Sequence, residues 1–244
     1  MCRHLAWLGA PQTVEELLYA PEHGLLRQSY APRRQVHGTM NADGFGLGWY
    51  HPARPEPARY RRSGPIWADA SLASMAGVLR SGCVLAAVRS ATAGTPPDES
   101  ACAPFLLPGG VLLSHNGRVR IEAVAHLVDA GALAAVGSTV DSAYVAAVVA
   151  SRLDAGLAGA LASTVQDVGR LDPQARLNLL ATDGRETVAI TWGDTLWSRT
   201  SAGGTLLASE PGDEDPAWSE VPDRTLVRLR PEARPDAPLT LEDL

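Results

Sequence analysis

The chain has 244 residues, of which 45% are hydrophobic and 20% are charged, and its formal net charge is -6. This composition is typical of a globular protein of one or two domains, and it excludes a chain that is disordered throughout. With 27 acidic residues against 21 basic ones, the charge balance argues against a nucleic-acid partner. The apolar stretches are shorter than the roughly 18 residues that a membrane-spanning helix needs, which argues against a membrane protein.

The three cysteines, Cys2, Cys83 and Cys102, are odd in number and lack the spacing of metal ligands. A disulfide framework or a metal site is therefore not expected, and a reducing compartment is favoured. The first residues also lack the apolar core of a signal peptide. These features predict a cytoplasmic protein without a bound metal.

Short strands dominate the first half of the chain. Alternating or apolar runs that end in turn residues predict strands at 3–8, 44–50, 58–62, 84–88 and 111–114. Thr13 and Glu16 have the spacing of a capping box, which predicts a short helix through Tyr19. A second helix is expected over 69–80, where apolar residues recur at helical spacing.

Alanine-rich helices and then further strands follow in the second half. The helices are predicted at 121–130, 142–153 and 157–168, and the strands at 177–182, 187–192, 195–198, 205–208 and 226–229. Asp183-Gly184 and Gly193-Asp194 each predict a hairpin turn. This order predicts an α+β fold in which helices cover antiparallel sheets. We expect one domain at 2–230 and a flexible, proline-rich tail at 231–244.

Cys2 is the most informative single position. Cysteine is small enough for an initiator methionine to be removed before it, which would leave a thiol and a free α-amine on one residue. An α-amine, with an ordinary pKa of about 7.7–8.0, can act as a general base, and a thiol is a nucleophile even near neutral pH. Taken alone, however, a cysteine at the second position is more often buried or incidental.

Polar residues follow two apolar strands and precede one helix. Arg89 is either a salt-bridged edge residue or a bidentate clamp for a carboxylate. Asn116-Gly117 is either a tight turn or, through the Asn116 amide and the Gly117 N–H, an oxyanion hole. Asp141 is either a helix N-cap or an acceptor for a substrate ammonium.

The order of these motifs resembles that of the class II glutamine amidotransferases, a branch of the N-terminal-nucleophile hydrolases. The matching elements are Cys2, Asp43-Gly44, Arg89-Ser-Ala-Thr92, His115-Asn116-Gly117 and Asp141. The resemblance implies a four-layer αββα sandwich with two mostly antiparallel sheets. It implies that Cys2 is the nucleophile and its amine the base, and that Asn116 and Gly117 form the oxyanion hole. It also implies that Arg89, helped by Thr92, binds the α-carboxylate of a glutamyl group, and that Asp141 accepts the α-ammonium.

A narrower resemblance extends over nearly the whole chain. Residues 26–35, 40–49, 208–211, 218 and 221–223 are similar to those of the γ-glutamyl-hercynylcysteine S-oxide hydrolases of ergothioneine biosynthesis. This resemblance implies an amidohydrolase that releases glutamate through a Cys2 thioester, without a metal or organic cofactor. The implied partner is a small γ-glutamyl substrate rather than a nucleic acid or a membrane, and a homo-oligomer is allowed.

Three alternatives stay open at this point. One is a glutaminase subunit that passes ammonia to a partner synthase, and another is a γ-glutamyl peptidase for glutathione-like substrates. The third is a non-catalytic binding protein of the same fold. Glutaminase activity that a second protein stimulates would favour the first alternative, and a retained initiator methionine would favour the third.

The implied leaving group carries a trimethylammonium, which aromatic faces and carboxylates bind well. Tyr30, Phe45, Trp49 and Tyr50 lie close to Asp43 in the sequence, around a glycine-rich segment. We therefore expect this segment, with Asp43 and Trp49 as binding residues, to line the leaving-group pocket.

Overall fold

Two antiparallel sheets form the centre of the molecule. The computed structural model describes residues 2–91, 94–95, 98–230 and 240–244. The first sheet has seven strands, in the order β11 (Ser219–Glu220), β9 (Trp197–Ser201), β10 (Gly204–Ala208), β1 (Arg3–Thr13), β4 (Arg80–Val88), β2 (Phe45–Trp49) and β3 (Ala58–Arg62). The second has six, in the order β13 (Thr240–Asp243), β12 (Thr225–Leu229), β8 (Thr187–Ile190), β7 (Arg176–Thr182), β6 (Val111–Arg118) and β5 (Phe105–Leu107).

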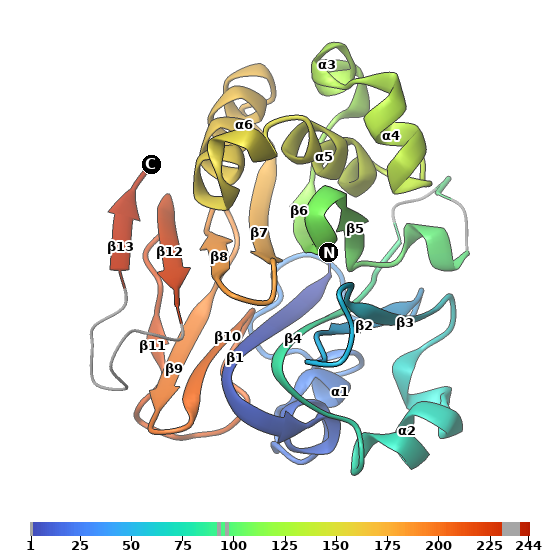
Figure 1. Cartoon of the computed structure of the whole chain (residues 1–244), viewed down its shortest axis with the longest axis vertical. Helices are drawn as coiled ribbons and strands as arrows, with labels where there is room; N and C mark the ends of the chain where they lie inside the picture. The colour runs from blue at the N-terminus through green and yellow to red at the C-terminus, as the bar shows by residue number, and fades with distance from the viewer. Residues whose placement is uncertain (1, 92–93, 96–97, 231–239) are drawn as a thin grey trace.

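Helices cover the outer face of each sheet (Figure 1). The first sheet packs against α1 (Leu25–Gln28), α2 (Ala70–Ala76) and a π-helical turn (Glu15–Tyr19). The second packs against α3 (Ile121–Val124), α4 (Ala130–Val136), α5 (Asp141–Ala150) and α6 (Leu157–Leu171). The layers are thus helix, sheet, sheet and helix, which confirms the predicted αββα sandwich.

The alternation of side chains along the central strands produces these layers. In β1, Leu5 and Trp7 pack under the helices of the first sheet, whereas Ala6 and Leu8 pack between the two sheets. Because neighbouring residues of a strand point to opposite faces, a strand that is apolar on both faces is buried on both. Each large apolar side chain buried in this way stabilises the fold by about 1.5–3 kcal/mol.

A cap and a turn predicted from short sequence motifs are confirmed, because interactions between residues close in the sequence determine them. The Thr13 N–H donates to Glu16 Oε2 at 2.7 Å, and the Glu16 N–H donates to Thr13 Oγ1 at 3.1 Å, so the capping box is present. Asp69 caps α2 by accepting from the Leu72 N–H at 2.8 Å. Gly184, with a φ of 86°, turns the chain between β7 and β8 as expected.

Two helix ends and one hairpin turn were predicted wrongly, because contacts between segments that are distant in the sequence determine them. The helix predicted over 69–80 ends at Ala76, since the chain enters β4 at Arg80 and pairs with β1. The helix predicted over 121–130 is divided into α3 and a short 3-10 turn before α4 begins at Ala130. Gly193-Asp194 does not close a hairpin, because β8 and β9 belong to different sheets and the chain crosses between them here.

Most of the tail expected at 231–244 lies outside the described residues, which omit 231–239. Its last part is not a free tail, because Thr240–Asp243 form β13 and pair with β12 from Thr225 to Arg228. Among the helices that the structure describes, none by itself is long and apolar enough to cross a membrane. The pair α4 and α5 meets that measure only jointly, and the chain bends by 118° between them.

Candidate active site

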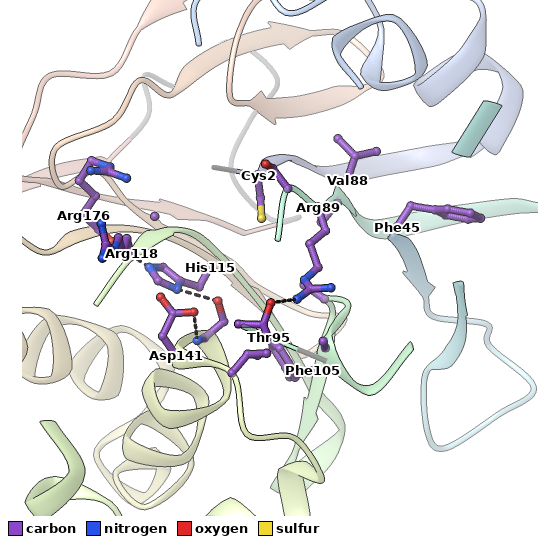
Figure 2. A pocket seen from close by; sticks show the side chains of 17 residues that line it. Cys2, Phe45, Val88, Arg89, Thr95, Phe105, His115, Arg118, Asp141 and Arg176 are labelled. Atoms are coloured by element: carbon purple, nitrogen blue, oxygen red, sulfur yellow. Dashed lines mark hydrogen bonds between the residues drawn. The ribbon is translucent and has the colours of Figure 1, made fainter. Parts of the chain in front are cut away.

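A pocket of about 660 Å³, including the solvent at its mouth, opens where strand ends of both sheets meet. It is lined by Cys2 ahead of β1, by the ends of β4 and β6, by the start of β7 and by the first turn of α5. Figure 2 shows the Cys2 sulfur directed into this space, with Arg89 to one side and His115 and Asp141 below. The fold therefore brings residues that are distant in the sequence around one thiol.

The backbone and the thiol of Cys2 are held in different environments. The Cys2 N–H donates to Asn116 Oδ1 at 3.1 Å. Burial raises the pKa of the Cys2 thiol, and the nearby Asp141 carboxylate adds to this, while a backbone hydrogen bond from Ser90 and the Arg89 guanidinium act in the opposite direction. Because the thiol pKa is raised overall, the resting group is protonated near neutral pH, and its reaction as a nucleophile requires a base.

The side-chain amide of Asn116 is hydrogen-bonded through its oxygen but not through its nitrogen, among the described residues. Its Oδ1 accepts from Cys2, whereas its Nδ2 is buried and has no hydrogen-bond partner among the described residues. The expected alternative, a tight turn at Asn116-Gly117, is wrong, because β6 continues through both residues to Arg118 and pairs with β7. An unpartnered buried donor beside a nucleophile is the arrangement that an oxyanion hole needs.

Gly117 must be a glycine at this position. A Cβ there would lie 1.9 Å from the Arg176 carbonyl oxygen and 2.6 Å from His115 Nε2. Both distances are shorter than non-bonded contacts allow, so a side chain would push β7 or His115 away. Gly117 thus lets the backbone of β6 lie close to the Arg176 carbonyl of β7 and to the His115 ring.

Arg89 extends along the pocket wall from the end of β4. Its side chain is buried, with Nη1 donating to the Asp43 carbonyl oxygen at 3.1 Å and Nη2 donating to Thr95 Oγ1 at 2.8 Å. The Asp43 carboxylate accepts from the Ala91 N–H at 2.8 Å, so Asp43 positions the segment that carries Arg89 and does not itself line the pocket. Thr92, the expected helper of Arg89, lies outside the described residues.

Asp141 is the first residue of α5, and Val140 occupies the N-cap position that was the alternative for it. Its Oδ2 accepts from the Val119 N–H at 3.0 Å and its Oδ1 accepts from the Ser142 N–H at 2.8 Å. These bonds fix a carboxylate at the floor of the pocket, below Cys2 in Figure 2. The position suits an acceptor for a substrate ammonium.

Two histidines lie near the site: hydrogen bonds fix the tautomer of His115, and burial keeps His4 neutral. His115 Nε2 lies 2.8 Å from the Arg176 carbonyl oxygen, which can only accept, so this nitrogen carries the proton; Nδ1 lies 2.9 Å from Ser142 Oγ. Burial lowers the pKa of His4 to about 3, with the neighbouring His115 and Arg3 adding to the shift. His4 is therefore neutral at physiological pH and a weak base.

The structure does not bring Trp49 to the pocket. Phe45 lines the pocket, but Trp49 is at the other end of β2 and packs on the core between the first sheet and its helices. Tyr50 follows it, and its hydroxyl lies 2.7 Å from the Thr182 carbonyl oxygen at the opposite edge of the sandwich. Tyr30 is partly exposed and packs edge-on against Trp67. Of the four aromatic residues expected around the leaving group, Phe45 alone lines the pocket.

Several pocket residues were missed in the sequence. Ser142, Arg118, Arg176, Thr95 and Phe105 line the pocket without belonging to any motif considered above. The β6–β7 register, which sets Arg118 opposite Arg176, is a long-range feature with no local signal. Over the part of the chain that the structure describes, no group of three or more His, Cys, Asp or Glu side chains is placed to hold a metal ion.

Comparison with known proteins identifies the family of this chain. The family model for class-II glutamine amidotransferases matches residues 25–208. Since this match covers most of the chain, the protein belongs to the class II glutamine amidotransferases. A curated relative from Mycolicibacterium smegmatis, named gamma-glutamyl-hercynylcysteine sulfoxide hydrolase, is 54% identical over 94% of this chain and 96% of its own. A Mycobacterium tuberculosis relative of the same name is 48% identical over 94% of this chain and 93% of its own.

Solved structures share the fold at lower identity. A glutamine aminotransferase class-II domain protein from Silicibacter pomeroyi superposes with a TM-score of 0.71 at 22% identity, covering 100% of this chain and 99% of its own. The glutamine phosphoribosylpyrophosphate amidotransferase of B. subtilis superposes with a TM-score of 0.67 at 15% identity, and this chain covers 49% of its length. These likenesses support the αββα architecture.

Proposed function

We propose that this protein hydrolyses the γ-glutamyl amide of γ-glutamyl-hercynylcysteine sulfoxide, giving glutamate and hercynylcysteine sulfoxide. The relatives that bear this activity in their names match the chain over nearly its whole length, at 48% and 54% identity. The observation in the site that carries the proposal is Asn116, whose Oδ1 binds the Cys2 backbone nitrogen while its Nδ2 is free. One side chain can thus orient the base and receive the oxyanion.

In the first step, the Cys2 sulfur attacks the carbonyl carbon of the γ-glutamyl amide. With the initiator methionine removed, the α-amine of Cys2 takes the thiol proton, and Asn116 Oδ1 holds this amine beside the sulfur. The negative charge that forms on the carbonyl oxygen is stabilised by Asn116 Nδ2 and the Gly117 N–H. The C–N bond then breaks, the ammonium returns its proton to the departing amine, and a γ-glutamyl thioester remains on Cys2.

In the second step, water attacks the thioester carbon. The neutral α-amine accepts a proton from this water, the same two donors stabilise the second oxyanion, and the C–S bond breaks. Glutamate leaves, and the thiolate recovers the proton from the α-ammonium. Substrate and water are the only reactants consumed, so the enzyme returns to its starting state.

The γ-glutamyl half of the substrate fits the charges on the two sides of the pocket. Arg89 supports the α-carboxylate, because a buried guanidinium forms strong charge-assisted hydrogen bonds. Asp141 supports the α-ammonium from the floor of the pocket. These contacts orient the γ-carbonyl and leave the group beyond the amide nitrogen to contact the remaining walls.

The test is glutamate release by enzyme whose first residue is Cys2, measured side by side on three compounds. We expect a large preference in kcat/KM for γ-glutamyl-hercynylcysteine sulfoxide over glutathione and free glutamine. Equal values on glutamine and the sulfoxide would contradict the proposal and restore a glutaminase that supplies ammonia to a partner.

A further inference from the structure

Two arginines lie opposite each other at the edge of the pocket. Arg118 at the end of β6 and Arg176 at the start of β7 are direct partners in the antiparallel register, and both line the pocket of Cys2. Like charges placed directly opposite each other on neighbouring strands destabilise a sheet. Such a pair is therefore expected where an anion is to be bound.

Among the described residues, Arg176 has an acidic partner and Arg118 has none. Arg176 Nε donates to Asp194 Oδ2 at 3.2 Å, and the Asp194 side chain is buried. Arg118 is exposed, and its side chain forms no ion pair or hydrogen bond with any described residue. The edge of the pocket thus keeps a surplus positive charge that is accessible from solvent.

The surplus positive charge lies across the pocket from Arg89. In Figure 2, Arg89 lies on one side of Cys2, and Arg118 and Arg176 lie on the other. The described lining of the pocket contains these three arginines and one acidic residue, Asp141. Free glutamine, with one carboxylate and one ammonium, would engage Arg89 and Asp141 and leave the second cationic side without a counter-charge.

We propose that Arg118 and Arg176 bind a carboxylate on the leaving-group side of the scissile amide, so that the site selects γ-glutamyl conjugates of α-amino acids over glutamine. The inference rests on the proposed γ-glutamyl hydrolysis. When the departing amine is the α-amine of a cysteine derivative, a carboxylate is attached one carbon from the amide nitrogen. This spacing requires a cationic group close to the nucleophile and opposite Arg89.

The neighbouring contacts make this cationic edge rigid. The Arg176 carbonyl oxygen accepts from His115 Nε2 at 2.8 Å, and Gly117 leaves no side chain between the two strands. Asp194 orients the Arg176 guanidinium through Nε, which leaves the terminal nitrogens for a ligand. A planar guanidinium fixed in this way is suited to a carboxylate.

The experiment compares γ-glutamyl-hercynylcysteine sulfoxide with an analogue built on cysteamine, which lacks only the carboxylate next to the amide. Binding of both compounds to the Cys2→Ala protein is measured by calorimetry, with and without Arg118→Ala. We expect Arg118→Ala to weaken binding of the carboxylate compound about 10-fold or more and to leave the analogue within about twofold. Arg176→Lys, which keeps the charge but loses the fork, is expected to weaken the carboxylate compound selectively and by less.

The control is Arg185→Ala, which removes an equal charge from the exposed β7–β8 turn, where the Arg185 side chain forms no hydrogen bond or ion pair with described residues. Equal weakening of both compounds by Arg118→Ala, no weakening of either, or no measurable binding of the carboxylate compound would overturn the inference. Selective weakening in a protein whose Cys2 form fails to hydrolyse the sulfoxide would instead contradict the proposed function, while the carboxylate-binding role of Arg118 and Arg176 would still be supported.

Discussion

The two ends of the sandwich contain similar polar groups, which are hydrogen-bonded at one end and open to a pocket at the other. At the end away from the pocket, the Tyr50 hydroxyl lies 2.7 Å from the Thr182 carbonyl oxygen, and Cys83 Sγ lies 3.2 Å from the Thr182 hydroxyl. At the Cys2 end, the thiol faces an open pocket and the buried Asn116 Nδ2 has no partner within the described residues. Satisfied polar groups stabilise a fold, whereas groups left open at a concave site are available to a ligand.

Cysteine substitutions at the two ends test this contrast with the largest expected effect. Burial raises the pKa of the Cys83 thiol to about 11, and the nearby Asp183 carboxylate adds to this, whereas hydrogen bonds from Thr182, Thr187 and the Gly184 backbone act in the opposite direction. We expect Cys2→Ala to lower kcat by about 10⁴-fold or more without unfolding the protein, since the nucleophile is removed. Cys83→Ala should keep kcat within about threefold and reduce the free energy of unfolding by about 1 kcal/mol. Glutamate release and urea titration measure the two quantities; comparable turnover in both variants would contradict the account.

Two asparagines sharpen the comparison within the Cys2 end itself. Asn178 lies directly opposite Asn116 across β6 and β7, but both halves of its amide are used, with Nδ2 donating to the Asp194 carbonyl oxygen at 2.7 Å and Oδ1 accepting from the Trp192 N–H at 2.8 Å. Asn116→Ala should lower kcat about 10²- to 10³-fold with little effect on stability. Asn178→Ala should instead lower stability by about 2 kcal/mol or more.

The measurements for the asparagines are kcat and the midpoint of thermal unfolding, both recorded for each variant. If Asn116→Ala lost stability as strongly as Asn178→Ala while keeping its turnover, the free Nδ2 would have no part in the reaction. Asn116 would then be a structural residue like its neighbour.

Arg89→Ala should have the next largest effect. Removing charge-assisted hydrogen bonds of about 1.5–3 kcal/mol predicts a loss of roughly 10- to 150-fold in kcat/KM. Arg61→Ala is a matched control, because Arg61 contacts the Cys102 carbonyl oxygen at 3.2 Å outside the pocket. Steady-state kinetics on the sulfoxide substrate distinguish them, and activity within about twofold of wild type in Arg89→Ala would remove Arg89 from substrate binding.

The smallest expected effect is on the pH dependence of kcat/KM, which substitutions at Arg89 and Asp141 should shift in opposite directions. Since the Cys2 thiol pKa is raised, the reactive form has one proton fewer than the resting form, and kcat/KM should rise with pH. Arg89 lowers this pKa and Asp141 raises it. Arg89→Met should therefore move the rising limb to higher pH, and Asp141→Asn should move it to lower pH. Shifts in the same direction would show that these charges do not act on the thiol.

The parts of the molecule that sequence could predict are those determined by neighbouring residues. Apolar alternation gave the central strands, and the Thr13–Glu16 pair gave its capping box, which the structure confirms. The motif residues Cys2, Arg89, Asn116 and Asp141 could be placed near one another only through a family resemblance, because their proximity depends on how the two sheets stack.

The remaining features depend on register and on distance along a strand. Trp49 was assigned to the pocket because it is close to Phe45 in the sequence, but four residues of extended chain separate them by about 13 Å. The pairing of Arg118 with Arg176 requires the exact β6–β7 register. The short strands β11 and β13 are exposed, so they lack the apolar pattern from which a strand could be predicted.

The central claim is that the α-amine of Cys2 acts as the base for its own thiol. The most direct measurement uses one preparation with an N-terminal tag that a protease removes to leave Cys2 as the first residue. Glutamate release is measured before and after cleavage, with the mass of the terminus determined each time. The account predicts no turnover while the tag is attached and full turnover once it is removed, with the same unfolding temperature in both forms. Equal turnover by protein whose tag is still attached would contradict it.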